Sequence, residues 1–121
     1  MQNGEPRAAR YVTVWEFQVR PGSEQAFERS YGSDGEWVQL FRKARGYVRT
    51  DLYRDLKDRQ RYVTIDLWES EAAYLNFREQ YVREYGAIDQ RCQEMTAKET
   101  ALGAYEIVQA IRLDRDTGTD T

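Results

Sequence analysis

The sequence contains no histidine, and it has a single cysteine and two prolines among 121 residues. Without histidine, the chain cannot form a Ser-His or Cys-His nucleophile pair, a His-ligated haem or the usual zinc site. The lone Cys92 cannot form an intramolecular disulfide. We therefore expect no tightly bound haem or metal, and any chemistry must use carboxylates, hydroxyls, aromatic rings, Arg or Lys.

Long apolar runs and basic patches are also missing. No apolar stretch is long enough to span a bilayer, and the first ten residues lack the apolar centre of a secretory signal. The net charge is -3, and acidic and basic residues are interleaved without a basic stripe that would follow phosphates. We expect a cytoplasmic protein that binds neither membranes nor nucleic acid.

The length and the 40% hydrophobic content predict one domain that buries its own core. We place this domain at residues 11–112. Residues 1–10 and 113–121 are polar and show no periodicity, so both are predicted to be flexible tails.

The pattern of residues 62–77 changes from a period of two to a helical period at residues 68–70. In the strand, one face carries Val63, Ile65 and Leu67, and the other carries Tyr62, Thr64, Asp66 and Trp68. Neither row is typical of a solvated face, so both faces of this strand are predicted to be covered.

Similar patterns predict strands at residues 11–20, 47–55, 60–69 and 101–111. Helical segments lie between the first two strands and between the last two, with Ser23 and Ser70 as N-caps and a helix break at Gly86. This order predicts an α+β, ferredoxin-like split βαβ fold with a four-stranded antiparallel sheet. Helices cover one face, and a second copy most simply covers the aliphatic row on the other, which gives a two-fold homodimer.

The covered face offers a candidate pocket for an aromatic small molecule. Its most informative residue is Asp66, because a buried carboxylate needs a partner. Burial alone would raise its pKa and suit it to proton abstraction, whereas a nearby Arg49 or Arg54 would lower that pKa and make the residue structural. Both possibilities stay open, as does a Tyr-rich core whose hydroxyls pair with Asp66 and Thr64.

Three segments resemble the antibiotic biosynthesis monooxygenase family: residues 17–22 (FQVRPG), residues 52–55 (LYRD) and residues 68–73 (WESEAA). The resemblance extends over residues 11–108. It implies a dimeric α/β barrel in which each subunit keeps a pocket between its own sheet and helices. Some members oxidise polyketide-derived phenols with O2 and without metal or flavin, and others break down haem.

By position, Trp68 and Tyr74 match a pocket Trp and Tyr of the family. Thr64 stands where the quinone-forming members have Asn, and Trp15 stands where the haem-degrading members have Asn. The helix-borne His of the haem-degrading members is absent, which speaks against haem degradation.

These features give two competing hypotheses. The first is a cofactor-independent monooxygenase that oxidises a phenol or polyketide-like aromatic molecule with O2. Its expected catalytic residues are Asp66, Trp68 and Tyr74, and its expected substrate-binding residues are Trp15, Phe17, Thr64 and Tyr81. The alternative is a non-catalytic ligand-binding or structural protein on the same dimeric scaffold.

Overall fold

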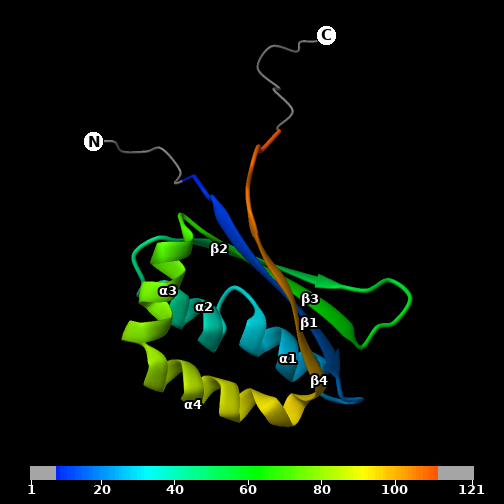
Figure 1. Ribbon diagram of the computed structural model, residues 1–121. Coiled ribbons are helices and arrows are strands. Elements are labelled where there is room, and N and C mark those ends of the chain that lie inside the picture. The colour runs from blue at the N-terminus through cyan, green and yellow to red at the C-terminus, as the bar shows by residue number, and fades with distance from the viewer. Residues whose placement is uncertain (1–7, 112–121) are drawn as a thin grey trace.

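The computed structural model describes residues 8–111. Strands β1 (Tyr11–Val19), β2 (Tyr47–Arg54), β3 (Arg61–Trp68) and β4 (Thr96–Glu106) form one antiparallel sheet in the order β2-β3-β1-β4. Helices α1 (Glu24–Tyr31), α2 (Glu36–Phe41), α3 (Glu71–Gln80) and α4 (Val82–Cys92) lie on one face of this sheet, and η1 (Gln93–Met95) leads into β4 (Figure 1). The predicted α+β ferredoxin-like fold is confirmed. Residues 1–7 of the predicted N-terminal tail and the whole predicted C-terminal tail, residues 113–121, lie outside the described residues.

The alternation predicted for β3 is present in the structure. Its even-numbered residues are buried under the helices, and its odd-numbered residues are half-buried on the other face. The strand register places Thr13 of β1 on one side of Asp66 and Thr50 of β2 on the other. The inward row of β3 therefore forms the floor of the layer between the sheet and the helices.

Local sequence signals explain where the helices begin. Ser70 is the N-cap of α3, and its hydroxyl accepts a hydrogen bond from the backbone N–H of Ala73 at 3.0 Å. Before α1, Gly22 has a φ of 92°, a left-handed conformation that suits glycine, and its N–H donates to the Glu24 carboxylate. Ser23 occupies the N-cap position of α1, but its side chain makes no capping hydrogen bond.

The predicted helix break and both ends of the predicted last strand are wrong. The predicted break at Gly86 falls inside α4, and the helices divide instead at Tyr81, between α3 and α4. Nothing lies within 4 Å of the position that a Gly86 side chain would take, so this exposed glycine has no packing role that ends the helix. The last strand extends from Thr96 to Glu106 rather than over residues 101–111. Its first residues pair with β1 despite their polar composition, and its pairing ends where Glu106 lies opposite Tyr11, the first residue of β1.

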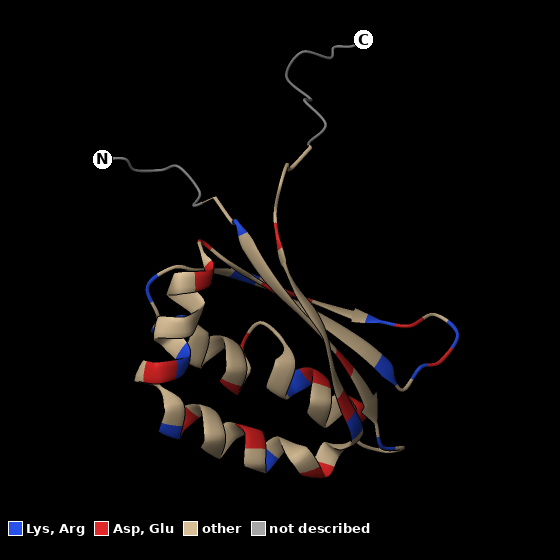
Figure 2. Ribbon diagram, in the orientation of Figure 1, with Lys and Arg blue, Asp and Glu red and all other residues tan. Residues whose placement is uncertain are grey.

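The face of the sheet opposite the helices carries an apolar row that is only partly covered, with charged residues such as Glu16 and Asp51 beside it. Val12, Val14, Val63, Ile65 and Leu67 are half-buried there. In Figure 2, charged residues concentrate on the helices and at the turn between β2 and β3, and they are sparser along the middle of the sheet. Within residues 8–111, no helix is both long enough and apolar enough to cross a membrane.

Candidate functional site

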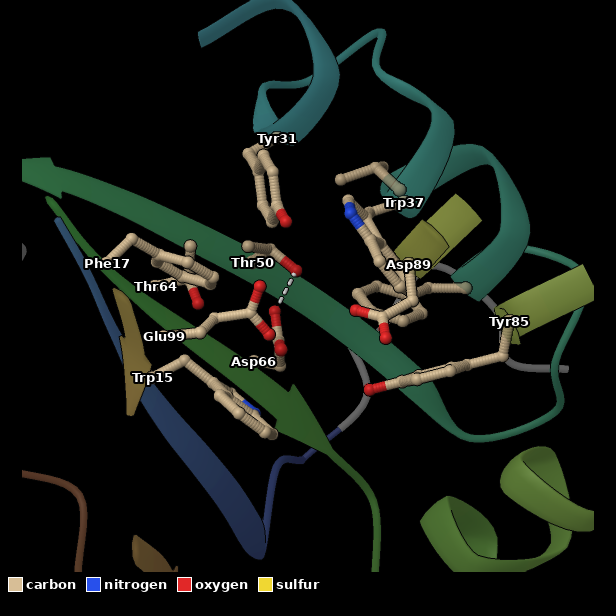
Figure 3. A pocket seen from close by; sticks show the side chains of 12 residues that line it. Trp15, Phe17, Tyr31, Trp37, Thr50, Thr64, Asp66, Tyr85, Asp89 and Glu99 are labelled. Carbon is tan, nitrogen blue, oxygen red and sulfur yellow. Dashed lines mark hydrogen bonds between the residues drawn. The ribbon is translucent and has the colours of Figure 1, made fainter. Parts of the chain in front are cut away.

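A small cavity lies between the inward face of the sheet and helices α1, α2 and α4 (Figure 3). Its volume is about 40 Å³, which is enough for water molecules. Aromatic rings and three carboxylates make up most of its wall. The lining residues are Trp15 and Phe17 of β1, Tyr31 of α1, Trp37, Val38 and Phe41 of α2, Thr50 of β2, Thr64 and Asp66 of β3, Tyr85 and Asp89 of α4, and Glu99 of β4.

Asp66 is the most deeply buried carboxylate of this wall, with 8% of its surface exposed. Thr50 Oγ1 donates a hydrogen bond to Asp66 Oδ1 at 2.7 Å, and Thr13 Oγ1 donates a longer one to Asp66 Oδ2 at 3.5 Å. Burial raises the pKa of Asp66 to about 6, and the two threonine hydrogen bonds oppose that rise only in part. Its partners are neutral hydroxyl groups.

The two arginines that the sequence offered as partners of Asp66 lie elsewhere. Arg49 pairs with Asp51, and Arg54 pairs with Glu28 at 3.0 Å. Within the described part of the chain, neither Lys nor Arg lines the cavity. The structural interpretation of Asp66 as one half of a buried ion pair is therefore wrong.

Asp89 and Glu99 add two further carboxylates to the cavity. Figure 3 shows their side chains directed toward the same space as Asp66. Glu99 is half-buried, and its burial raises its pKa, with a smaller contribution from the charge of Asp89. Because no Lys or Arg among residues 8–111 lines the cavity, these carboxylates favour their protonated forms and are suited to accept a proton from a ligand.

Two tyrosine hydroxyls complete the polar part of the wall. Burial raises the pKa of both Tyr31 and Tyr85 above the ordinary value, so both phenols stay protonated at neutral pH. The guanidinium of Arg78, a residue of helix α3, lies 3.9 Å from the centre of the Tyr85 ring. Tyr85 therefore has a proton that it can donate to a ligand oxygen, whereas the Tyr31 hydroxyl already interacts with the side chains of Trp37 and Cys92.

Trp68 lies outside the cavity wall. It is fully buried, and its ring packs against the rings of Phe41, Tyr47, Tyr74 and Phe77 at centroid distances of 5.1–5.7 Å. We call these five residues the Trp68 cluster. The indole Nε1 of Trp68 is buried without a hydrogen-bond partner in the described structure. Trp68 thus acts as core in this conformation.

The seven residues expected in the site divide between two neighbouring regions. The cavity contains Trp15, Phe17, Thr64 and Asp66, whereas Trp68, Tyr74 and Tyr81 are not among its lining residues. Arg78 donates to the Tyr74 hydroxyl at 2.9 Å, and the Tyr81 hydroxyl donates to the Lys43 carbonyl at 3.3 Å. Whether any of the seven takes part in catalysis stays a prediction.

Seven lining residues with side-chain hydrogen-bonding groups or rings were not predicted as site residues: Tyr31, Trp37, Phe41, Thr50, Tyr85, Asp89 and Glu99. Tyr85 was the easiest of them to predict from the sequence, because it continues the helical spacing of Tyr74 and Tyr81. Glu99 was missed because the last strand was predicted to begin after it.

No group of three or more His, Cys, Asp or Glu within residues 8–111 is arranged to hold a metal ion.

Comparison with known proteins identifies structural relatives. A mutant form of SnoaB, a cofactor-independent oxygenase from Streptomyces nogalater, has 20% identity and a TM-score of 0.68, and the match covers 86% of this chain and 98% of that chain. A dimeric ferredoxin-like protein from an uncultured marine organism has 13% identity and a TM-score of 0.67, and the match covers 88% of this chain and 95% of that chain. A putative antibiotic biosynthesis monooxygenase from Deinococcus radiodurans has 11% identity and a TM-score of 0.69, with 86% and 98% covered.

At these identities, the structural matches support the fold. A search among proteins with curated descriptions finds no match. The family model described as antibiotic biosynthesis monooxygenase matches residues 10–85, which is more than half of the sequence. The chain therefore belongs to the antibiotic biosynthesis monooxygenase family.

Proposed function

We propose that this protein is a cofactor-independent monooxygenase that oxidises a phenol-like aromatic molecule with O2, and that Asp66 is its base. The observation that carries the proposal is a buried carboxylate in the wall of an aromatic cavity, with no cationic partner among residues 8–111. A carboxylate with a pKa of about 6 is mostly ionised at neutral pH and is a stronger base than an ordinary Asp. Membership of the family supports the reaction class.

In this mechanism, Asp66 takes the hydroxyl proton of the phenol, and the electron-rich anion reacts directly with O2. One oxygen atom of O2 becomes a new carbonyl oxygen of the product quinone. The other oxygen atom leaves as water, which carries the two hydrogens that the substrate loses. Oxidation of a phenol to a quinone releases four electrons and O2 accepts four, so the balance needs no external reductant.

The other lining residues have roles that follow from their chemistry. Trp15, Phe17 and Trp37 provide flat apolar surfaces against which an aromatic ring packs. Tyr85 donates a hydrogen bond to an oxygen atom of the substrate and stabilises the charge that develops there.

For the residues behind the wall, we propose indirect roles. Trp68 supports Phe41, which lines the cavity, and Tyr74 packs against Trp68. Tyr81 packs against Phe77 in the same aromatic layer. Their replacement is expected to change the shape of the cavity rather than its chemistry.

The cavity volume of about 40 Å³ is far below the roughly 300 Å³ or more of typical small-molecule sites. An aromatic substrate therefore requires side chains to move when it binds. Trp15, Tyr85 and Glu99 are half-buried members of the wall and are the side chains that we expect to move. Once the cavity has opened, we expect substrates with more aromatic rings to bind more tightly, because they bury more apolar surface.

The test measures oxygen uptake with a panel of hydroxylated naphthalenes and anthracenes. We expect Asp66→Asn to lose turnover by about a hundredfold or more, because the amide keeps the shape but cannot accept a proton. Asp34→Asn, in the exposed loop between α1 and α2, is the matched control and should keep full activity. Undiminished activity in Asp66→Asn would remove this residue as the base, and no uptake by the wild type across the panel would overturn the proposal.

The second candidate is a ligand-binding or structural protein without turnover. The small cavity volume favours it, as does the fact that both carboxylate oxygens of Asp66 already accept hydrogen bonds. This candidate predicts that the same aromatic phenols bind without oxygen uptake. Calorimetry beside the oxygen measurement separates the two functions.

We also propose that the protein is a homodimer formed through the open face of the sheet. Val14, Ile65 and Leu67 lie on that face, and a second copy would cover this apolar surface. A relative with the same fold is described as dimeric. Light scattering should give twice the chain mass of 14.3 kDa for the wild type and the single mass for Ile65→Lys. A wild-type mass near 14.3 kDa at micromolar concentration would contradict the dimer.

A further inference from the structure

A chain of hydrogen bonds begins at Asp66 and leads away from the cavity. Thr50 Oγ1 donates to Asp66 Oδ1 at 2.7 Å, as the dashed line in Figure 3 marks. The same Thr50 Oγ1 lies 2.7 Å from the hydroxyl oxygen of Tyr47, close enough for either group to donate. Three oxygen atoms from β3 and β2 are thus connected by two short hydrogen bonds.

The far end of this chain reaches a different pocket. Tyr47 and Thr50 line a second pocket of about 280 Å³ beside β2, together with Arg42 and Arg49. Arg42 and Arg49 are exposed, and Tyr47 is half-buried, so this outer pocket faces solvent. Thr50 lines both the outer pocket and the cavity. The hydrogen-bonded chain therefore extends from the buried carboxylate, through the wall of the cavity, to the outer pocket at the surface.

We propose that Thr50 and Tyr47 form a proton path through which Asp66 exchanges its proton with solvent in the outer pocket while a ligand fills the cavity. The proposal rests on the proposed function in one respect, namely that Asp66 takes a proton from the ligand. A bound aromatic molecule displaces water from the cavity, so Asp66 then needs another route to solvent. Thr50 and Tyr47 provide that route.

Each step of the path moves one proton between two oxygen atoms. Protonated Asp66 gives its proton to Thr50 Oγ1, Thr50 gives its own hydroxyl proton to the Tyr47 oxygen, and Tyr47 gives its hydroxyl proton to water. The three residues end with one proton fewer, and the water gains it. The reverse sequence protonates Asp66 again.

This path requires the direction of the hydrogen bonds to change with the charge of Asp66. When Asp66 is ionised, Thr50 donates to it and accepts from Tyr47. When Asp66 is protonated and donates to Thr50, the Thr50 hydroxyl turns to donate to Tyr47. A purely structural role for Thr50 needs only its bond to Asp66, and it does not require Tyr47 to respond.

Other charged and titratable groups surround the path, and any titration must separate their effects. They are Tyr31 of α1, Arg42 after α2, Arg49 and Asp51 of β2, Tyr85 and Asp89 of α4, and Glu99 of β4. Glu99 is the most important of these, because it shares the cavity with Asp66 and its own pKa is raised by burial. A Glu99→Gln background removes this source of ambiguity.

The deciding experiment follows the carbon NMR signals of the Asp66 carboxyl and the Tyr47 ring carbon that bears the hydroxyl, from pH 4 to pH 8, without ligand. We expect the Tyr47 signal to shift with the same midpoint as Asp66. The shift should vanish in Thr50→Val, which has no hydroxyl, and should return in Thr50→Ser. Asp66→Asn and Tyr47→Phe assign the two signals.

Two results would overturn the path. One is a Tyr47 signal that stays constant while Asp66 titrates. The other is a Tyr47 shift of unchanged size in Thr50→Val, which would reflect only the electric field of the carboxylate. This titration uses no substrate, so its outcome is independent of whether oxygen uptake is found.

Turnover provides a second readout if the proposed function holds. Tyr47→Phe keeps the ring packed against Trp68 and removes only the hydroxyl. We expect it to lower kcat about tenfold with little change in KM or in melting temperature, and Thr50→Ser to stay closer to the wild type than Thr50→Val does. An unchanged kcat in Tyr47→Phe would contradict the path even where Asp66→Asn abolishes activity.

Discussion

Asp66 and Trp68 are two residues apart on the same inward row of β3, and their surroundings differ completely. Asp66 faces a cavity and accepts hydrogen bonds from two threonine hydroxyls, whereas Trp68 is enclosed by the aromatic rings of its cluster. The difference comes from the layer above the sheet. Helix α3 places Phe77 and Tyr74 directly against Trp68, while α1, α2 and α4 leave a space above Asp66. One row of a strand thus contains both core and candidate site.

The largest effect on stability is expected at Trp68, the residue that belongs to the core. Trp68→Ala should lower the free energy of unfolding by about 3–5 kcal/mol, because it removes a fully buried ring from the Trp68 cluster. Trp68→Phe should lose much less, since it keeps a ring and removes the unpaired indole N–H. Urea unfolding of the wild type and both variants measures this. A loss below 1 kcal/mol in Trp68→Ala would show that Trp68 is not core.

At Asp66, which faces the cavity, the expected effect on stability depends on pH. The folded-state pKa of Asp66 is about 6 and its ordinary value is 3.8, so the folded state binds the proton more tightly than the unfolded state does. Stability should therefore fall as pH rises from about 4 to about 6 and then level off. The difference of roughly two pKa units corresponds to about 3 kcal/mol at most.

Asp66→Asn removes this titration and is the matched comparison. Its free energy of unfolding is measured in urea at several pH values. Because the variant has no carboxyl at this position, its stability should fall less than that of the wild type between about pH 4 and pH 6. Parallel pH dependence in the two proteins would mean that Asp66 does not have a raised pKa. Asp34→Asn, in an exposed loop, should follow the wild type.

A smaller effect on stability is expected at Trp15, which lines the cavity but is only half-buried. Trp15→Ala should cost about 1–2 kcal/mol of stability and weaken the binding of a hydroxylated naphthalene about tenfold, because a stacking surface is lost. Leu56→Ala, at an exposed turn, should change neither quantity. If Trp15→Ala binds as well as the wild type, the cavity is not the binding site.

Much of the fold could be predicted because local patterns and packing agree. Val63, Ile65 and Leu67 alternate with the buried row as expected, and the Ser70 hydroxyl makes the predicted capping hydrogen bond. The errors fall where the pattern is weak. Gly86 ends no helix because it lies on an exposed side, and Thr96 begins an edge strand whose early residues are polar.

The site was predictable only in part. The period of two correctly directed Trp15, Phe17, Thr64 and Asp66 toward one covered face. It does not determine which helix lies above each residue, so the family resemblance placed Trp68 in the pocket while the structure encloses it. Glu99 lies opposite Phe17 in the sheet and shares its face, but this relation is visible only once the register of β4 is known.

The central claim is that Asp66 is a buried carboxylate with no cationic partner in the described part of the chain and is therefore able to take up a proton near neutral pH. The most direct test is the NMR titration of its side-chain carboxyl carbon, with Asp66→Asn used for assignment. The account predicts a midpoint near 6. A midpoint at or below the ordinary value of 3.8 would contradict it, because the carboxylate would then be stabilised in its charged form and would be too weak a base.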